Sequence, residues 1–398
     1  MKYDFENINT RYHIGSQKWQ ELKNNPAVSK SKDEIIPFSV ADMELKTAPE
    51  ITEGLKKFID ENVLGYAGSY DEYNKVVCDW IKKHHNWEIE PSWIVQTHSI
   101  VNAFFNAVKA FTNKGDGVML FTPVYYPMYN AISINERKLV ESPLINNGTT
   151  YDIDWDDFTK KAQEDSTKML ILCSPHNPCG RIWTKAELTR ISEICLANDV
   201  FVVSDEIHSD LIMPGFEHIS YGTISQEARQ NSIVCTAPSK TFNLAGLQLS
   251  NIIIPNESYR QKFIAEQLTD ADFGCGVLAY EACRLAYSKG ESWLGELIKL
   301  IDTNKQIIID FMQEHFPQVK ITQLQATYLL WLDFRAFNLS TEELEKINRE
   351  IALLYFDEGY IFGKAGSGFE RWSLACPTKY IHQALQRLYL AYKKFAKK

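Results

Sequence analysis

The chain has 398 residues, of which 45% are hydrophobic and 23% are charged. This composition is typical of a soluble globular protein, and the length predicts two domains or one large one. Lysine and arginine number 42 against 51 acidic residues, which gives a net charge of −9. A negative balance with scattered basic residues argues against nucleic acid or an anionic membrane as a partner.

The N-terminal residues lack the apolar core of a signal peptide, and no apolar run approaches the ~20 residues that a membrane helix needs. Eight cysteines are spread along the chain without a CxxC pair, and several lie in apolar segments. A cysteine in such a segment behaves as a small hydrophobic residue. We therefore expect free thiols in a reducing cytoplasm, with disulfides as the alternative.

The middle of the chain alternates short apolar runs with longer amphipathic segments. In chain order, the pattern predicts a helix over 100–111, strands over 118–121 and 168–173, a helix over 185–199, and strands over 200–204 and 232–236. The strand runs are continuously apolar, which is typical of a mostly parallel sheet covered on both faces. This region is therefore predicted to be an α/β domain.

After about residue 288 the pattern changes. Long charged helices are predicted over 291–314, 341–358 and 378–396, with strand-like segments near 319–334 and 371–375. This mixture is typical of an α+β unit. We predict a large domain over 46–288 and a smaller domain formed by 1–45 together with 289–398.

Polar side chains follow three predicted strands at the points where the strands end. The three loops have the sequences SPHNPCGRIW, DEIHSD and APSKTFNLAGL. They carry Asn177, Asp205, His208, Ser239 and Lys240. Ligands of open α/β sheets bind beyond the carboxyl ends of the strands, so we expect these loops to converge. Each residue alone has an ordinary explanation, such as a surface lysine, a helix-capping Asp, a turn residue or a structural His. Asn, Asp and Lys on successive strand ends together favour a shared site.

Pyridoxal phosphate needs this combination of groups. Its aldehyde needs an amine, which Lys240 supplies as a Schiff base if its surroundings lower the lysine pKa. Its ring nitrogen needs a carboxylate, for which Asp205 is the candidate. Its ring hydroxyl needs donors, and Asn177 and His208 are the candidates.

The phosphate and the ring face need further contacts. The backbone of Ser99, Ile100 and Val101 opens the predicted helix over 100–111, and helix starts bind phosphate. Tyr125 and Tyr126 follow the strand over 118–121, and either is a candidate for stacking on the ring. The alternative for both tyrosines is ordinary packing.

The motifs SPHNPCGRIW, VSDEIHSDL, APSKTFNLAGLQ and GSGFERWSLACP resemble those of the fold type I pyridoxal-phosphate enzymes, the aspartate aminotransferase superfamily. Within it, FSVADMELKTAPEI and GYAGSYDEYNKVVCDWIKKHHNWEIE resemble the cystathionine β-lyase-type C–S lyases. The resemblance covers essentially the whole chain. It implies the α/β fold of pyridoxal-phosphate-dependent transferases, with a smaller α+β domain, the pyridoxal 5'-phosphate cofactor and a homodimer.

The resemblance also implies roles for individual residues. Lys240 is implied to hold the cofactor and to move the Cα proton, while Asp205 pairs with the pyridinium. Tyr125 is implied to stack on the ring. Ser239 is implied to join the phosphate site, and Tyr66 to reach the phosphate from the partner subunit.

Two further residues are implied at the substrate. Arg371 is implied to bind the substrate carboxylate, a task that suits its planar guanidinium. The alternative for Arg371 is a surface salt bridge. Tyr126 is a second candidate for contact with the substrate.

Several positions depart from the residues usual in this superfamily. Gln248 stands where aminotransferases usually have a phosphate-binding arginine, which favours the lyase branch. His98–Ser99 replaces a usual Pro-Gly or Asn-Gly at the phosphate site. Glu44, Leu45 and Trp372 replace other residues, and we expect them to reshape the substrate pocket. The glycines of KAGSGF form no dinucleotide fingerprint, because no strand–turn–helix unit follows them.

The sequence supports three hypotheses about function. In the first, Lys240 removes the Cα proton of a cysteine thioether, the C–S bond breaks, and the released aminoacrylate hydrolyses to pyruvate and ammonia. Cystathionine would give homocysteine as the thiol. The second is an aminotransferase on the same scaffold, which needs a 2-oxo acid acceptor. The third is a protein whose main role is to bind a transcription regulator, and no sequence feature argues for it.

Overall fold

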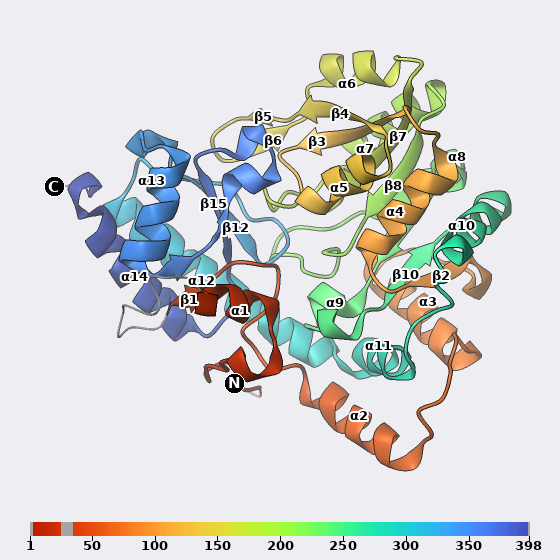
Figure 1. Cartoon of the computed structure of the whole chain (residues 1–398), viewed down its shortest axis with the longest axis horizontal. Helices are drawn as coiled ribbons and strands as arrows, with labels where there is room; N and C mark the ends of the chain where they lie inside the picture. The colour runs from red at the N-terminus through yellow and green to blue at the C-terminus, as the bar shows by residue number, and fades with distance from the viewer. Residues whose placement is uncertain (1–2, 25–34, 397–398) are drawn as a thin grey trace.

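The computed structural model describes residues 3–24 and 35–396. Its largest sheet has seven strands in the order β2–β10–β9–β8–β7–β3–β4 (Figure 1). Strand β10 runs antiparallel to both of its neighbours, and the other pairs are parallel, so the predicted mostly parallel sheet is confirmed. The strands are β2 (Ile94–Thr97), β3 (Gly117–Thr122), β4 (Lys138–Pro143), β7 (Thr167–Cys173), β8 (Phe201–Asp205), β9 (Ser232–Thr236) and β10 (Ser250–Ile253).

Helices cover both faces of this sheet. On β8, Val203 packs in the cluster that contains α4 (Ile100–Phe111), and Val202 packs in the cluster that contains α7 (Lys185–Ala197). Successive residues of a strand point to opposite faces, so a strand covered on both sides must be apolar throughout. This explains why the apolar runs predicted as strands form β3, β7, β8 and β9. The structure also confirms the helix predicted over 100–111, and it confirms the one predicted over 185–199 up to Ala197. The α4 face also holds α5 (Tyr126–Ile134) and α10 (Glu257–Thr269), and the α7 face holds α6 (Trp155–Ala162).

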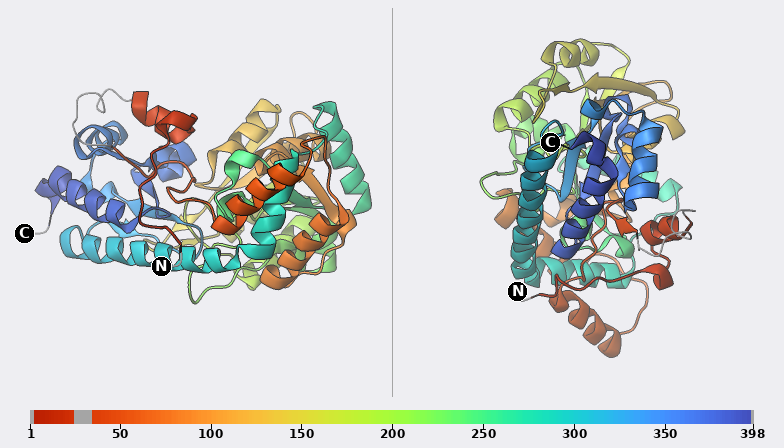
Figure 2. Two further views of the ribbon diagram at one scale, coloured as in Figure 1. Left: turned by 90° about the horizontal axis from the view of Figure 1, so that it is seen from below. Right: turned by 90° about the vertical axis from the view of Figure 1, so that its left-hand side faces the viewer.

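A long helix leads into the C-terminal region. Gly290 separates α11 (Val277–Lys289) from α12 (Glu291–His315), which confirms the helix predicted over 291–314. Figure 2 shows α12, in cyan, running along one edge of the molecule. A second, antiparallel sheet in the order β11–β12–β15–β14 shares its core with α14 (Thr378–Tyr392). Its strands are β11 (Lys320–Ile321), β12 (Leu329–Asp333), β14 (Asp357–Glu358) and β15 (Phe369–Ser373).

The helix predicted over 341–358 is wrong in its second half. Helix α13 (Thr341–Lys346) continues as a π-helical stretch, Ile347–Ala352, and Leu353 then has a φ of +54°. This left-handed conformation ends the helix. The chain continues as β13 (Leu354–Tyr355) and β14, so acidic residues predicted in a charged helix lie on a buried strand instead.

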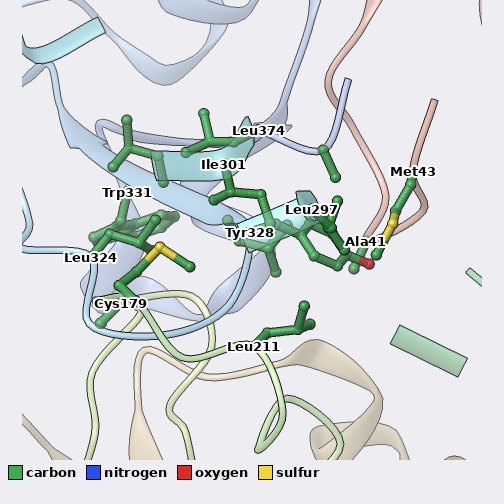
Figure 3. Close-up of a cluster of buried hydrophobic side chains, with 14 of the residues drawn as sticks. Ala41, Met43, Cys179, Leu211, Leu297, Ile301, Leu324, Tyr328, Trp331 and Leu374 are labelled. Carbon is green, nitrogen blue, oxygen red and sulfur yellow. The ribbon is translucent and has the colours of Figure 1, made fainter. Parts of the chain in front are cut away.

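The N-terminal segment packs against the C-terminal region. Strand β1 (Ile36–Pro37) pairs in parallel with β13, and residues 25–34 of the predicted smaller domain lie outside the described residues. Figure 3 shows Ala41 and Met43 in a buried cluster that also contains Leu297 and Ile301 of α12. The division into 46–288 and 1–45 with 289–398 stays a prediction.

Two expectations about the whole chain concern membranes and thiols. Among residues 3–24 and 35–396, no helix has the length and apolar character that a membrane crossing requires. All eight cysteines are free thiols, as predicted. Cys78 is half-buried, and the buried ones are Cys173, Cys179, Cys195, Cys235, Cys275, Cys283 and Cys376.

Candidate active site

The three strand ends meet at one cavity. Asn177 lies beyond β7, Asp205 ends β8, and Lys240 lies in the short helix α9 (Pro238–Thr241) that follows β9. Because β7, β8 and β9 are adjacent and parallel, their carboxyl ends share one edge of the sheet. The cavity is lined by Ala41, His98, Ser99, Ile100, Val101, Phe104, Tyr125, Asn177, Asp205, Ile207, His208, Ser239, Lys240, Ala245 and Ser250.

Asp205 is a buried carboxylate that forms no ion pair with any described residue. Its Oδ1 accepts a hydrogen bond from the backbone N–H of Ile207 at 3.2 Å. Burial raises the pKa of Asp205 to about 7, although this hydrogen bond and the nearby Lys240 oppose the rise. A carboxylate in this state is suited to pair with a cation or a protonated ring nitrogen of a ligand.

Glu206, the next residue, differs from Asp205 because both of its carboxylate oxygens have side-chain or backbone partners in the protein. Its Oε2 lies 3.1 Å from Nε2 of His218, and its Oε1 accepts hydrogen bonds from Ser204 Oγ (3.0 Å) and from the backbone N–H of Tyr221 (2.8 Å). Burial raises the pKa of Glu206, but these partners outweigh burial and hold the pKa below its usual value. Of the two adjacent carboxylates, Asp205 lines the cavity and Glu206 is part of the core.

His208 and Asn177 stand on the same cavity wall. His208 is buried, and its Nδ1 has no hydrogen-bond partner among residues 3–24 and 35–396. Burial, with Lys240 and Arg371 nearby, lowers the pKa of His208 well below its usual value, so the ring is neutral. Asn177 Oδ1 accepts a hydrogen bond from Arg371 Nη1 at 2.8 Å, which fixes the Asn177 amide at the wall.

The amine of Lys240 donates a hydrogen bond to the backbone carbonyl of Ala41 at 2.7 Å. Burial of the amine lowers the pKa of Lys240 to about 8; Arg371 acts in the same direction, while Asp42 and Asp205 oppose it. A lysine with this pKa is partly neutral near physiological pH, and a neutral amine attacks carbonyl carbons.

The start of α4 forms another wall of the cavity. Ser99 caps the helix by accepting a hydrogen bond from the backbone N–H of Asn102 at 3.2 Å, and Ile100 and Val101 follow at the cavity. The free N–H groups of a helix start attract phosphate. His98 lies beside them, with its Nδ1 3.2 Å from Asp272 Oδ1. In the unusual His98–Ser99 pair, it is Ser99 that caps the helix start.

The two tyrosines occupy different positions. Tyr125 lines the cavity, whereas Tyr126 is 42% exposed and does not line it. Their ring centroids are 5.4 Å apart. Burial raises the pKa of Tyr125, so its hydroxyl stays protonated at neutral pH. Tyr125 is therefore the better-placed candidate for stacking on a bound ring.

Arg371 lies on β15 and reaches the cavity through Asn177, although its own side chain is not part of the lining. Its Nη1 donates to Asn177, its Nη2 pairs with Asp357 directly across the β14–β15 ladder, and its guanidinium lies 4.6 Å from the ring centre of Phe362. Its Nε is buried and has no partner in the structure. The alternative of a surface salt bridge is excluded, because Arg371 is 2% exposed.

Comparison with known proteins shows which family this chain belongs to. The family described as aminotransferase class I and II matches residues 33–388. The chain belongs to this family. Cystathionine beta-lyase PatB of Bacillus subtilis is 37% identical, over 97% of this chain and 98% of its own length.

Solved structures agree with this placement. Cystalysin from Treponema denticola, whose crystal structure contains a pyridoxal 5'-phosphate cofactor, matches with a TM-score of 0.95 and 44% identity, over 99% of this chain and all of its own. The C-S lyase of Staphylococcus hominis, pyridoxal-phosphate-bound and complexed with L-cycloserine, matches with a TM-score of 0.89 and 30% identity, over 98% and 99% of the two chains. The predicted resemblance and the fold type I architecture are confirmed.

Tyr66 and Gln248, both of which the sequence linked to the phosphate site, do not line the cavity of this family member. Tyr66 lies in the irregular segment after α2 (Pro49–Glu61) and is fully exposed, at 112% of the reference area. Gln248 is also exposed and does not line the cavity. The role implied for Tyr66 needs a second chain, and it stays a prediction.

None of Glu44, Leu45 and Trp372 lines the cavity. Their effect on the substrate pocket stays a prediction, because Arg371, the predicted substrate contact, also lies outside this lining. Trp372 follows Arg371 on a strand, so its side chain points to the opposite face, where it stacks on Phe356 with 4.4 Å between ring centroids. Leu45 is part of the main hydrophobic core. Glu44 is buried in a network with side chains of the N-terminal segment: Arg11, Lys18 and Trp19.

Two contacts of the site were not predicted. The backbone carbonyl of Ala41 accepts a hydrogen bond from Lys240, and a backbone contact of this kind cannot be predicted from a pattern of side chains. Asp357 pairs with Arg371, but it falls in the segment that was wrongly predicted as helix. A strand assignment for Asp357–Glu358 is the signal that would have placed it opposite Arg371.

Proposed function

We propose that the protein is a pyridoxal-phosphate-dependent C–S β-lyase, which cleaves cystathionine or a related cysteine thioether to a thiol, pyruvate and ammonia. The observation that carries the proposal is the placement of Asn177, Asp205 and Lys240 at the ends of three adjacent strands around one cavity. The name of the PatB relative and the cofactor in the cystalysin structure support it.

The residues around the cavity fit this cofactor. The wall presents an amine of lowered pKa (Lys240), a buried carboxylate without a cation (Asp205) and a buried ring nitrogen without a partner (His208 Nδ1). Bound there, pyridoxal phosphate supplies an aldehyde for covalent attachment and an electron sink for the substrate. The proposed contacts are the aldehyde carbon with Lys240, the ring nitrogen with Asp205, the ring hydroxyl with Asn177 and His208, the phosphate with Ser99, Ile100, Val101 and Ser239, and the ring face with Tyr125.

Lys240 is the base of the proposed reaction. When its amine is free, a pKa of about 8 leaves part of it neutral, and the neutral amine would be able to take the Cα proton of a substrate held at the cofactor. Asp205 keeps the ring nitrogen protonated, because a buried carboxylate is stabilised by a cation beside it. Arg371 holds the substrate carboxylate and so fixes which Cα bond faces Lys240. Departure of the thiol from Cβ completes the elimination.

The test of the activity is product analysis. Purified protein given cystathionine and no 2-oxo acid is expected to release homocysteine, pyruvate and ammonia in equal amounts. Absence of pyruvate and thiol contradicts the proposal. Turnover that strictly requires a 2-oxo acid acceptor would establish the aminotransferase instead. A panel of cysteine S-conjugates then ranks the thioethers.

Replacing Arg371 with lysine is expected to weaken substrate binding. The substitution keeps the positive charge beside Asp357 but removes the planar guanidinium that binds a carboxylate through two donors. One lost hydrogen bond to a charged group corresponds to roughly a 10- to 100-fold rise in KM. Steady-state kinetics check this, with Arg335→Lys as the control, because Arg335 pairs with Asp333 of the same sheet, whereas Arg371 also hydrogen-bonds to Asn177 on the cavity wall.

A kcat loss with unchanged KM in Arg371→Lys would contradict the binding role. Arg371→Ala is less informative. It leaves the carboxylate of Asp357 without its buried partner, and breaking such a pair costs about 3–5 kcal/mol of stability.

The proposed functional unit is a homodimer in which Tyr66 reaches the cofactor phosphate of the partner subunit. The segment after α2 exposes Val63 (88%) and Leu64 (55%) beside Tyr66, and Phe273 is 81% exposed in the loop before α11. The same loop carries Asp272, which pairs with His98 at the cavity. Exposed apolar side chains of this kind are typical of an interface, and burial in a dimer would shield them from water.

Mixing two inactive variants is expected to restore activity if Tyr66 acts across the interface. We expect Tyr66→Ala and Lys240→Ala each to be inactive alone. A heterodimer of the two contains one site with both residues intact, so random exchange in an equal mixture should restore about a quarter of the wild-type activity. Subunit exchange followed by an activity assay checks this. Absence of any restored activity in verified heterodimers would contradict a contribution from the partner.

The proposed location is the cytoplasm. All eight cysteines are free thiols, and seven of them are buried. A reducing compartment maintains such thiols, whereas an oxidising one favours disulfides.

A further inference from the structure

The amine of Lys240 and the guanidinium of Arg371 are joined by a short chain of contacts through the N-terminal segment. Lys240 Nζ donates to the Ala41 carbonyl at 2.7 Å. The preceding residue, Val40, donates its backbone N–H to Asp357 Oδ2 at 2.9 Å. The same oxygen of Asp357 pairs with Nη2 of Arg371. One carboxylate oxygen therefore contacts both the Arg371 side chain and the turn that carries the acceptor for Lys240.

The turn at Val40 is strained. Its φ is +58°, in the left-handed region, which a β-branched residue such as valine adopts only when the surroundings require it. Two further hydrogen bonds hold the turn on its far side: Asp42 N–H donates to the Val40 carbonyl at 2.8 Å, and Lys18 Nζ donates to the Asp42 carbonyl at 2.8 Å. Strained backbone of this kind is concentrated at functional sites.

The Ala41 carbonyl can only accept a hydrogen bond, so the free Lys240 amine must direct an N–H at it, and this determines where the remaining N–H and the lone pair point. A base must direct its lone pair at the proton it removes, and small errors in placement are costly. The proton in question is on Cα of the substrate, and Cα is bonded to the carboxylate that Arg371 is proposed to hold. The spacing between Lys240 and Arg371 must therefore match one amino-acid unit.

We propose that Asp357 is a positioning residue that fixes this spacing, by clamping the Val40–Ala41 turn that orients the Lys240 amine and by holding the Arg371 guanidinium at the same time. The inference rests on the proposed function, because it takes Lys240 as the base and Arg371 as the carboxylate receptor. It adds that the acceptor for the base belongs to the N-terminal segment, and that Asp357 on β14 determines its place.

The test uses the cofactor-loaded, full-length protein and two substitutions. Asp357→Ala removes both contacts of the carboxylate. Asp357→Asn keeps an oxygen that accepts from Val40 N–H and from Arg371, and it removes the charge. Asp333→Asn is the matched control, because Asp333 lies in the same sheet and pairs with Arg335, whereas the arginine that pairs with Asp357 also hydrogen-bonds to Asn177 on the cavity wall. Thermal unfolding of each variant confirms that the protein is folded.

The first measurement is amide hydrogen–deuterium exchange of the peptide over 36–45. We expect Asp357→Ala to accelerate exchange in this peptide by about 10-fold or more, because the Val40 N–H loses its acceptor and the strained turn opens. Asp357→Asn and Asp333→Asn should leave it near the wild-type rate. This readout does not depend on catalysis. Unchanged exchange in Asp357→Ala would overturn the clamp.

The second measurement is the exchange of the Cα proton of L-alanine with deuterium from the solvent, followed by NMR. This amino acid has no thiol to lose, so the Cα–H bond is replaced by Cα–D and no other bond changes. At saturating alanine, Asp357→Ala should slow exchange on the order of 10- to 100-fold, with a smaller change in the apparent dissociation constant. Asp357→Asn should recover most of the rate. A loss confined to binding, or an Asp357→Asn variant as slow as Asp357→Ala, would overturn the positioning role.

Failure of the proposed function has a different signature. Retained Cα exchange in Lys240→Ala would show that another group is the base, and it would remove the proposed function and this inference together. Loss of exchange in Lys240→Ala, combined with wild-type behaviour of Asp357→Ala, would leave the proposed function intact and overturn the inference alone.

Discussion

Replacing Lys240 with alanine is expected to abolish both the visible absorbance of the attached cofactor and the lyase activity. Among the described residues, Lys240 is the only lysine that lines the cavity, and it lies just beyond β9. Burial lowers its pKa to about 8. Loss of the nucleophile and of the base in one residue should lower kcat on the order of 10⁴-fold or more. Absorbance spectroscopy after dialysis and a pyruvate assay measure the two effects.

The control for this substitution is Lys262→Ala, on the exposed side of α10. It should keep both the absorbance and the turnover, because Lys262 does not line the cavity. Retained turnover in Lys240→Ala would contradict the proposed function. Retained absorbance with lost turnover would show that the cofactor stays bound without Lys240.

Replacing Asp205 with asparagine is expected to lower activity strongly while the cofactor stays attached to Lys240. An amide cannot keep the ring nitrogen protonated, and loss of one such electrostatic contact typically costs about 10²- to 10³-fold in rate. Absorbance reports whether the cofactor is attached, and kcat reports the loss. Wild-type kcat in Asp205→Asn would contradict the pairing of Asp205 with the ring nitrogen.

The cofactor-free protein gives a second readout of Asp205. Burial raises its pKa from 3.8 to about 7, so the folded state binds the proton more tightly than the unfolded state. The stabilisation from this proton is complete below about pH 4 and is lost as the pH rises to about 7, and it amounts to about 4 kcal/mol at most. Asp205→Asn should therefore unfold with less pH dependence between about pH 4 and 7, and it should be the more stable form at pH 8.

The neighbouring carboxylate provides the contrast. Glu206→Gln should destabilise the fold by about 2 kcal/mol, because a carboxylate that accepts from Ser204 and Tyr221 and contacts His218 is replaced by an amide. Its effect on kcat should be small. Denaturant unfolding at pH 7 and steady-state kinetics distinguish the two positions. Equal kinetic losses in the two variants would contradict the separation of roles.

The sequence predicted the sheet and its functional edge because both depend on local pattern. MLILC is apolar throughout and SIVCT is apolar in its centre, and a strand with that composition needs cover on both faces. The residue that ends or follows a parallel strand lies at the carboxyl edge wherever the helices pack. For this reason the strand pattern was enough to place Asn177, Asp205 and Lys240 at one site.

Local pattern failed where it was ambiguous. The segment 341–358 has helical spacing in its first half and ends in LLYFDE, an apolar run of four residues followed by two acidic ones, which is too brief to predict a strand by itself. The turn at Leu353 and the pairing of β14 with β15 determine that part of the chain. Because this part was predicted as a helix, the pairing of Asp357 with Arg371 was not predicted.

By itself the sequence determined the family, the mostly parallel sheet and the three strand ends that carry Asn177, Asp205 and Lys240. Only the tertiary structure decided that Tyr125 rather than Tyr126 lines the cavity, and which groups surround Lys240 and Arg371. The Lys240–Ala41 contact joins residues 199 positions apart, and the Val40–Asp357 contact joins residues 317 positions apart. Such contacts arise from the packing of the N-terminal segment and the C-terminal sheet against the cavity, which no periodicity along the chain encodes.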